Sequence, residues 1–286
     1  MATPALEPDA RRRAGGSSAG QWLLAVVLGA ASLLFVLPLF LMLSASFKPM
    51  AEIIQASPTL LPQSPTLDNF RYVLQEAPYL SWYRNSLVVS TAVTALCMFT
   101  SALGGYIFAK FEFPLKKPLF ALVLATLMIP FPVLLIPNYI VANRLGLLNS
   151  LWALILPGVV SAFGIFLVRQ FVAGIPSDLI EAARLDGASE WAIFARIVVP
   201  LVRPALAALG VFTFLASWND YLWPLVAIND LEKSTLPLAL TFFNSTHATR
   251  YDLVMAAATM AVVPVLIVFL IFQRQIVKAL VLAGMK

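Results

Sequence analysis

The sequence contains very little cysteine and histidine. Its 286 residues include one of each, Cys97 and His247. A single cysteine excludes an intramolecular disulfide framework, and the pair is too small for a His/Cys metal site, so we expect no metal. We interpret Cys97 as a small packed residue inside a helix and His247 as part of a solvated loop. A membrane-embedded enzyme would need a convergent set of catalytic side chains, which one histidine, one cysteine and a single aspartate within the spans cannot supply. We therefore expect no catalytic residue.

Charge is scarce as well, at 12% of residues compared with about 25% in soluble domains. Apolar residues make up 60% of the chain, and the mean hydropathy is +0.88. The sequence lacks the period-two alternation of a membrane barrel, so backbone groups in lipid must be bonded within helices. The composition predicts an all-α protein that crosses the cell membrane several times.

Six apolar stretches are long enough to cross a bilayer. A helix rises 1.5 Å per residue, so a hydrocarbon core of about 30 Å needs about 20 residues. The predicted spans cover approximately residues 22–43, 86–109, 119–141, 151–168, 204–228 and 253–272. The first span is longer than the apolar region of a signal peptide, and we interpret it as a retained anchor.

The distribution of lysine and arginine predicts the orientation of these spans. With the N-terminus inside, thirteen of the nineteen basic residues fall on the cytoplasmic side and six on the outer side. Cytoplasmic loops carry the excess of positive residues in membrane proteins. We therefore expect both termini in the cytoplasm. The net charge of +5 follows from this topology and gives no reason to expect a nucleic-acid partner.

The spans divide the chain into four predicted parts. Residues 1–21 have no periodic apolar pattern and are expected to be a disordered cytoplasmic tail. Residues 22–85 hold the first span and a long outer loop, residues 86–273 form the core domain, and residues 274–286 form a second cytoplasmic tail. The longest cytoplasmic connection within the core covers about residues 174–203.

The third predicted span contains Pro130, Pro132 and Pro137. Proline has no amide hydrogen and clashes with the carbonyl group four residues before it, so it kinks a helix. We expect a kink here and carbonyl groups without helical partners, that of Thr126 among them. This span either faces a polar cavity or is a bent packing helix, and both interpretations remain open.

The only acidic residue in any predicted span is Asp220, which follows Trp218 and Asn219. Inserting an aspartate at mid-membrane costs about 2.5 to 3.5 kcal/mol, so such a residue usually faces a polar interior. Pro224 lies four residues further on and deprives the Asp220 carbonyl group of its helical partner. Either Asn219 and Asp220 border a solute pathway, or they join helices by hydrogen bonds.

The connection at residues 174–203 contains several helix signals. Asp178 and Glu181 have the spacing of a capping box, which predicts a short helix. Gly187 suits a left-handed stop, and Ser189 can cap a second helix that ends at Pro200. The apolar stripe expected on the second helix consists of Trp191, Phe194, Ala195 and Val198. Such a helix, bend and helix could bind a partner protein or lie on the lipid surface.

The same segment resembles the EAA loop of binding-protein-dependent ABC importer permeases. The loop has the pattern EAA, three residues, G, nine residues, I, one residue, LP. Its positions are filled here by Glu181, Ala182, Ala183, Gly187, Ile197, Val199 and Pro200. Only Val199 departs from the pattern, where it replaces leucine.

Further matches resemble the carbohydrate, maltose-type branch of that family. They are Asp186 before Gly187, the run from Trp218 to Tyr221 followed by Pro224 and Leu225, Ile136-Pro137, Leu145-Gly146-Leu147, Gln273-Arg274 and Ile276-Val277. Near the C-terminus, Ala279 stands where relatives often have glycine, and we transfer no family role to the tail.

The resemblance implies a prokaryotic plasma-membrane permease subunit that moves a sugar or sugar-like solute inward by alternating access. It also implies an ATPase dimer, a second homologous permease subunit in a heterodimer, and an extracytoplasmic solute-binding protein. ATP and Mg²⁺ would bind on the ATPase subunits. This chain would carry no cofactor, and its sequence has no G-x-x-x-x-G-K-[ST] phosphate loop.

The resemblance also suggests roles for individual residues. Those expected to couple to the ATPase are Glu181, Ala182, Ala183, Asp186 and Gly187. Those expected to border the pathway are Asn219 and Asp220, with Trp218 and Asn138. The alternative is an ion- or proton-coupled secondary carrier in which Asp220 is the titrating group.

Overall fold

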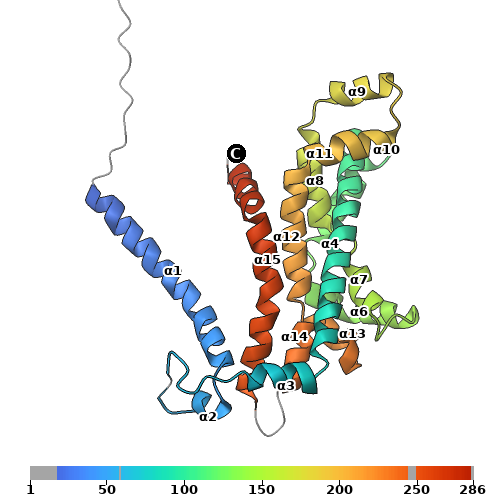
Figure 1. Cartoon of the computed structure of the whole chain (residues 1–286). Coiled ribbons are helices and arrows are strands. Elements are labelled where there is room, and N and C mark those ends of the chain that lie inside the picture. Colours follow the sequence, from blue (N-terminus) through green and yellow to red (C-terminus); the bar gives the residue numbers. More distant parts are fainter. Residues whose placement is uncertain (1–17, 58, 244–248, 285–286) are drawn as a thin grey trace, which may run out of the picture.

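The computed structural model describes residues 18–57, 59–243 and 249–284. Every regular element in these ranges is helical, which confirms the predicted all-α class. Three helices are each long and apolar enough to cross a membrane: α1 (Ser18–Ser46), α4 (Tyr79–Lys110) and α15 (Tyr251–Gly284) (Figure 1). Residues 18–21 belong to α1 rather than to the expected tail. The remainder of that tail and His247 lie outside the described residues.

Three bent helix pairs provide further possible crossings. α5 (Lys116–Thr126) meets α6 (Phe131–Arg144) at 102°, α7 (Leu151–Ile155) with η1 (Leu156–Gly158) meets α8 (Ala162–Ala173) at 41°, and the segment Glu190–Leu201 meets α12 (Arg203–Trp218) at 77°. If each pair is one span, the total is six, which is the predicted number.

The sharpest bend falls at the prolines of the third predicted span. α5 ends at Thr126, and Pro130 has an extended backbone immediately before α6. Pro132 lies in the first turn of α6, where its missing amide hydrogen costs nothing, whereas Pro137 lies inside the helix. The predicted kink is present. The Thr126 carbonyl group is nevertheless bonded, because it accepts a hydrogen bond of 3.2 Å from the Ile129 amide.

α4 is the central helix of the bundle and packs against α8 and α12. Glycines permit this close packing. A Cβ atom at Gly105 would lie 2.8 Å from the backbone nitrogen of Arg169, and one at Gly164 would lie 2.2 Å from the Ser101 Oγ. The contact also buries Val168 completely. This packing fixes the scaffold on which the two ends of the bundle are built.

Shorter elements lie at the two ends of the bundle. At one end, α9 (Ser177–Leu185) precedes α10 (Glu190–Ile193), the π-helix η2 (Phe194–Val198) and α11 (Val199–Leu201). Toward the other end lie α13 (Leu222–Ala227), η3 (Leu231–Lys233), α14 (Leu236–Ala239) and η4 (Leu240–Phe243). The start of α1 and the end of α15 both point toward the α9 end (Figure 1). That this end is cytoplasmic stays a prediction from the charge distribution.

α1 contacts α15 and diverges from it toward its own N-terminal end (Figure 1). None of its most apolar stretch is buried, and Ser44 and Ser46 near its C-terminal end are the first buried positions along it. The chain then continues through α2 (Met50–Ile53) and α3 (Asp68–Glu76) before it enters α4. The described residues therefore leave the most apolar stretch of α1 exposed, although the helix contacts α15.

Candidate functional site

α9 projects beyond the end of the helix bundle (Figure 1). Of its nine residues only Ile180 is buried, at 2% exposure. The apolar side chain of Leu185, the last residue of α9, is 90% exposed. The predicted coupling residues lie together on α9 and the turn after it, with Ala183 half-buried and the others exposed: Glu181, Ala182, Ala183, Asp186 and Gly187. α9 is therefore an accessible helix that a single buried side chain anchors to the bundle.

The bend after α9 is a glycine-dependent helix stop. Gly187 has a φ of +82°, which confirms the predicted left-handed conformation. The Gly187 amide donates to the Arg184 carbonyl at 3.0 Å, and the Ala188 amide donates to the Ala183 carbonyl at 2.9 Å. This pair of bonds is the Schellman arrangement, which satisfies the last carbonyl groups of a helix. No atom lies within 4 Å of a Cβ built at Gly187, so conformation rather than crowding favours glycine there.

The two predicted helix caps have different outcomes. Ser189 caps α10 as expected, because its Oγ accepts a hydrogen bond of 3.2 Å from the Ala192 amide. The capping box of Asp178 and Glu181 is wrong. α9 begins at Ser177, and its N-cap is Pro176, which offers no side-chain oxygen. Asp178 lies inside the first turn, where its negative charge interacts favourably with the positive end of the helix dipole.

The segment from α10 to α11 packs on the bundle through only half of the predicted stripe. Phe194 and Val198 are buried as predicted, whereas Trp191 is 62% exposed and Ala195 is exposed. Ile193, outside the stripe, is completely buried. The predicted stripe assumed an unbroken α-helical period, and the π-helix η2 shifts that period. The segment ends at Leu201, one residue after the stop expected at Pro200.

A chain of polar contacts links the two sides of the Gly187 bend to α4. The Tyr106 hydroxyl on α4 donates a hydrogen bond of 2.8 Å to Glu190, and the Arg184 Nε donates one of 2.6 Å to the other oxygen of that carboxylate. The Arg184 guanidinium also lies 5.8 Å from the ring of Phe111. Pairing with Glu190 raises the pKa of Arg184, so the guanidinium stays protonated. The end of α9 is thus fixed to a buried helix through one carboxylate.

A cavity of about 440 Å³ lies between α4, α12 and the bend from η1 to α8. Its wall is mainly apolar, with polar groups from four residues: Ser161, Thr213, Ser217 and Asp220. Cys97 also contributes to the wall and is 99% buried, its sulfur 3.8 Å from the Thr213 hydroxyl, so the interpretation of Cys97 as a packed residue is confirmed. Within the described ranges, no group of three or more His, Cys, Asp and Glu side chains could hold a metal ion.

Asp220 lies in a break between two helices and not within a continuous span. α12 ends at Trp218 and α13 begins at Leu222, so the predicted helix through residue 228 is interrupted. Pro224 explains the interruption, because in a continuous helix its ring would clash with the carbonyl group of Asp220, four residues before it. The freed turn lets the Asp220 carboxylate accept the amide of Trp223 at 3.4 Å, which caps α13.

The other residues predicted to border a pathway lie elsewhere. Trp218 is 3% exposed and stacks on Phe214 with ring centroids 5.7 Å apart, so it is part of the packed core. Asn219 is exposed, and its side chain donates back to the Leu215 carbonyl on its own helix at 2.8 Å. Asn138 is half-buried on α6 and does not line the cavity. The structure brings only Asp220 of these four to the cavity wall.

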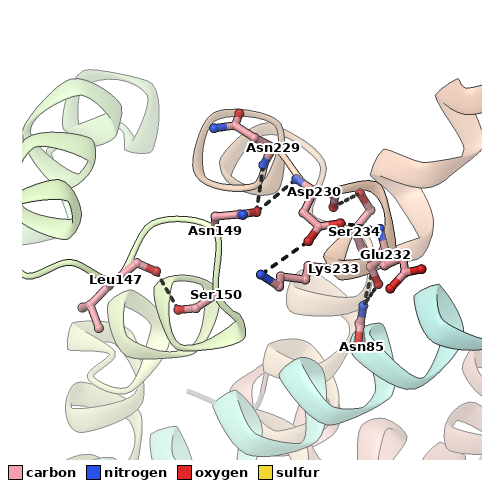
Figure 2. Close-up of polar contacts among 9 residues, drawn as sticks. All are labelled: Asn85, Leu147, Asn149, Ser150, Asn229, Asp230, Glu232, Lys233 and Ser234. Carbon is pink, nitrogen blue, oxygen red and sulfur yellow. Dashed lines mark hydrogen bonds and ion pairs between the residues drawn. The ribbon is translucent and has the colours of Figure 1, made fainter.

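A polar cluster lies around the chain that follows α13, which Figure 1 shows away from α9; Figure 2 gives its contacts in close-up. Asn149, in the turn between α6 and α7, has a left-handed backbone with φ of 57°. Its side-chain oxygen accepts hydrogen bonds from the amides of Asn229 (3.3 Å) and Asp230 (3.0 Å). The backbone amide of Asn149 donates a hydrogen bond of 2.8 Å to the Ala227 carbonyl group. One asparagine therefore ties this turn to the chain that follows α13.

The same chain segment is also fixed to α4. The Asp230 carboxylate accepts the Glu232 amide at 3.0 Å and pairs with Lys233 at 3.4 Å. The Asn85 side chain on α4 donates to the carbonyl groups of Glu232 (2.8 Å) and Ser234 (3.1 Å) (Figure 2). The turn at Asn149, the chain at residues 229–234 and α4 at Asn85 are therefore joined by polar contacts, and together they form what we call the rim.

Sequence reasoning missed Tyr106, Glu190, Asn149 and Asp230. Tyr106 and Glu190 are 84 positions apart, and no local pattern announces their contact. Asn149 offered a weak signal, because asparagine is enriched among residues with a left-handed backbone. The contacts of Asp230 could be identified only from the folded structure.

Residues 101–281 match the family described as binding-protein-dependent transport system inner membrane component. The chain is 37% identical over 268 residues to the arabinooligosaccharides transport system permease protein AraQ of Halalkalibacterium halodurans, a match that covers 93% of this chain and 96% of that protein. It is 34% identical over 256 residues to the lactose transport system permease protein LacG of Rhizobium radiobacter, covering 89% and 92% of the two chains.

The fold is similar to that of a solved chain from a bacterial ABC transporter involved in the import of the acidic polysaccharide alginate. The TM-score is 0.81 at 23% sequence identity, and the match covers 95% of this chain and 99% of that chain. A likeness at this level of identity establishes the architecture.

Proposed function

This chain belongs to the family of binding-protein-dependent transport system inner membrane components, and from that premise we propose that it moves a sugar or sugar-like solute inward, driven by ATPase subunits that are separate chains. It is a multi-pass protein of the bacterial inner membrane and a permease subunit of an ABC importer. We assign it no catalytic step of its own. ATP and Mg²⁺ would bind on the ATPase subunits, and this chain would respond to their opening and closing.

The relatives support a saccharide as the solute. One is described as a permease for arabinooligosaccharides and one as a permease for lactose. The 440 Å³ cavity offers hydroxyl groups and one carboxylate on an otherwise apolar wall. A few polar groups on an apolar surface suit a solute whose hydroxyl groups need hydrogen-bond partners. In this proposal Asp220 faces the pathway, and the alternative of an ion-coupled carrier receives no support from the family.

The observation that carries the proposal is the exposure of α9. A nine-residue helix with one buried side chain is poorly stabilised by its own protein. Leu185 and Ala182 are exposed apolar positions beside Glu181 and Asp186, a mixture that suits a protein partner. We assign this surface to the ATPase, with one ATPase subunit on this chain and the second on a homologous permease in a heterodimer. The extracytoplasmic binding protein would then dock at the rim that Asn149 and Asp230 hold together.

Reconstitution tests the proposal. The complete transporter in proteoliposomes should take up a labelled arabinooligosaccharide only when ATP is supplied on the α9 side, and the purified chain alone should show no uptake under a proton or sodium gradient. Gradient-driven uptake by the chain alone would overturn the importer assignment.

A matched pair of variants tests the docking surface. Ala182→Arg on α9 should abolish co-purification of the ATPase, whereas Ala51→Arg on α2, also an exposed alanine but at the other end of the bundle, should retain it. Retention of the ATPase by Ala182→Arg would show that α9 is not the docking helix.

A further inference from the structure

A second cavity, of about 640 Å³, lies where α5 begins, beside the ends of α4 and α8 nearest to α9. It shares no lining residue with the cavity that contains Asp220. Its wall combines two kinds of side chain. The apolar ones include Phe108, Phe113, Phe120 and Leu124, and the charged ones are Glu112, Lys116, Lys117 and Arg169.

The apolar wall is a connected aromatic surface. The ring of Phe108 lies 5.8 Å from that of Phe113 and 5.3 Å from that of Phe120. Ala121 and Leu124 extend this wall along α5, away from the charged residues at its start. A free inorganic anion would gain nothing from such a wall, whereas a hydrocarbon chain would gain free energy by burial against it.

The charged groups leave the cavity with an excess of positive charge. Glu112 pairs with Lys116 at 2.9 Å, and this contact lowers the pKa of Glu112, so the carboxylate stays ionised and balances one cation. Lys117 has no hydrogen bond or ion pair within the described part of the chain. The field of the lysines is reinforced by the positive end of α5, whose first turn contains no acidic residue.

Arg169 is held in place but not neutralised. Its Nε donates a hydrogen bond of 3.1 Å to the Phe108 carbonyl, and its guanidinium carbon lies 4.4 Å from the centre of the Phe120 ring. The described residues offer no acceptor to its terminal nitrogens. A guanidinium that is fixed at Nε and has both terminal nitrogens free is suited to bind phosphate in a bidentate manner.

We propose that this cavity binds an anionic phospholipid from the membrane leaflet on the α9 side. The phosphate group would lie between Arg169 and Lys117, and the first part of an acyl chain would lie against Phe108 and Phe120. Basic pockets between membrane helices are suited to such headgroups, and the apolar wall favours a lipid over a free phosphate ester. This assignment depends only on the chain lying in a membrane, so it stands or falls separately from the transported solute.

Native mass spectrometry of the assembled transporter with phosphatidylglycerol and phosphatidylcholine would test the proposal. Each Lys or Arg near a membrane surface contributes about 1 kcal/mol, so Lys117→Gln and Arg169→Gln should each weaken retention of phosphatidylglycerol about five-fold. Arg196→Gln removes an exposed arginine at the same end but outside the cavity, and it should leave retention unchanged. Equal retention of phosphatidylcholine by the wild type would overturn the proposal.

A second variant separates a lipid from free phosphate. Ala121→Phe fills the apolar part of the cavity and leaves every charged residue in place, so it should abolish lipid retention. If inorganic phosphate displaces the lipid from the wild type and binds equally to Ala121→Phe, the ligand is a soluble anion and the lipid assignment is wrong. The assignment is also wrong if the isolated chain retains the lipid but the assembled transporter does not, because another subunit then fills the cavity.

Discussion

The Tyr106 hydroxyl, on the central helix of the bundle, donates a hydrogen bond of 2.8 Å to Glu190, the first residue after the cap that follows the Gly187 bend. Arg184 at the end of α9 binds the other oxygen of the same carboxylate. A displacement of α9 therefore changes the contacts of α4, and α4 packs against both α8 and α12. The proposed docking helix and the scaffold around the cavity share this carboxylate.

Glu190→Gln should reduce solute uptake per ATP hydrolysed while the amount of inserted protein stays the same. The side chains of the ion pair with Arg184 are 40% and 43% exposed, so its loss should lower the free energy of unfolding by only about 1 kcal/mol. Uptake and ATP hydrolysis measured together in proteoliposomes would check this. Glu76→Gln, which removes an exposed carboxylate from α3, is the control. An unchanged ratio of uptake to hydrolysis in Glu190→Gln would exclude a coupling role for the polar chain.

Gly187→Val should uncouple the transporter without unfolding it. A left-handed backbone costs a residue with a Cβ about 1 to 2 kcal/mol, and a β-branched residue is especially disfavoured there. Gly187→Asn should be milder, because asparagine tolerates this conformation. Gly174→Ala is a control at an ordinary φ of −76°. Co-purification of the ATPase should fall in the order glycine, asparagine, valine, and equal binding by all three would contradict the account of the bend.

Asn149→Ala should loosen the rim shown in Figure 2. It removes the acceptor for two amides, at about 0.5 to 1.5 kcal/mol each, and places alanine at a φ of 57°. Hydrogen exchange at the amides of Asn229 and Asp230 should become at least about ten-fold faster. Asn149→Gly loses the same bonds without the backbone strain, so its effect should be smaller. Unchanged exchange in both variants would show that Asn149 does not hold the rim.

The loop around Glu52 should loosen in acid. The backbone amide of Gln63 is the main cause that lowers the pKa of Glu52, with help from Thr59, Ser64 and Lys48, against burial, which raises it. A carboxylate whose pKa is lower in the folded loop stabilises that loop above the unfolded pKa, and the stabilisation is lost as the pH falls through the folded value. Limited proteolysis of residues 47–66 should therefore accelerate below pH 4.5, the ordinary pKa of the group. Glu52→Gln should remove this dependence on pH.

Asp220→Asn should retain ATP-driven uptake, because the amide oxygen can still accept the Trp223 amide that caps α13. Asp220→Leu removes this acceptor at a cost of about 1 kcal/mol and should impair uptake more severely. Uptake assays on the two variants would check the order. Complete loss of uptake in Asp220→Asn would instead point to an essential titrating group.

The long helices and the helix stop at Gly187 could be predicted from sequence because their causes are local. An apolar run of sufficient length specifies a span, and glycine at a helix end specifies the left-handed turn. The break at Asp220 was only half predicted. Pro224 predicts that the Asp220 carbonyl group has no helical partner, but it does not predict that the helix ends there. The packing face of the segment after Ser189 was predicted correctly at Phe194 and Val198 but not at Trp191 and Ala195, since a π-helix changes the period on which such predictions depend.

The polar contacts of the site could not be predicted, because they join residues from distant parts of the chain. Asn149 and Asp230 are 81 positions apart, and Tyr106 and Glu190 are 84 apart. Each partner alone is an ordinary polar residue. The Arg169 environment has the same character, since its Phe108 contact spans 61 positions.

The exposure of the apolar stretch of α1 determines which features of its sequence matter. Helix packing within the chain contributes little to holding this helix in place, so the transfer of its side chains into hydrocarbon must supply most of the free energy. Transfer free energy depends on which side chains are present and hardly on their order. Shuffling the exposed apolar residues of α1 should therefore leave the amount of inserted subunit unchanged. If their order matters although the contact with α15 is kept, a neighbour outside this chain packs against that stretch.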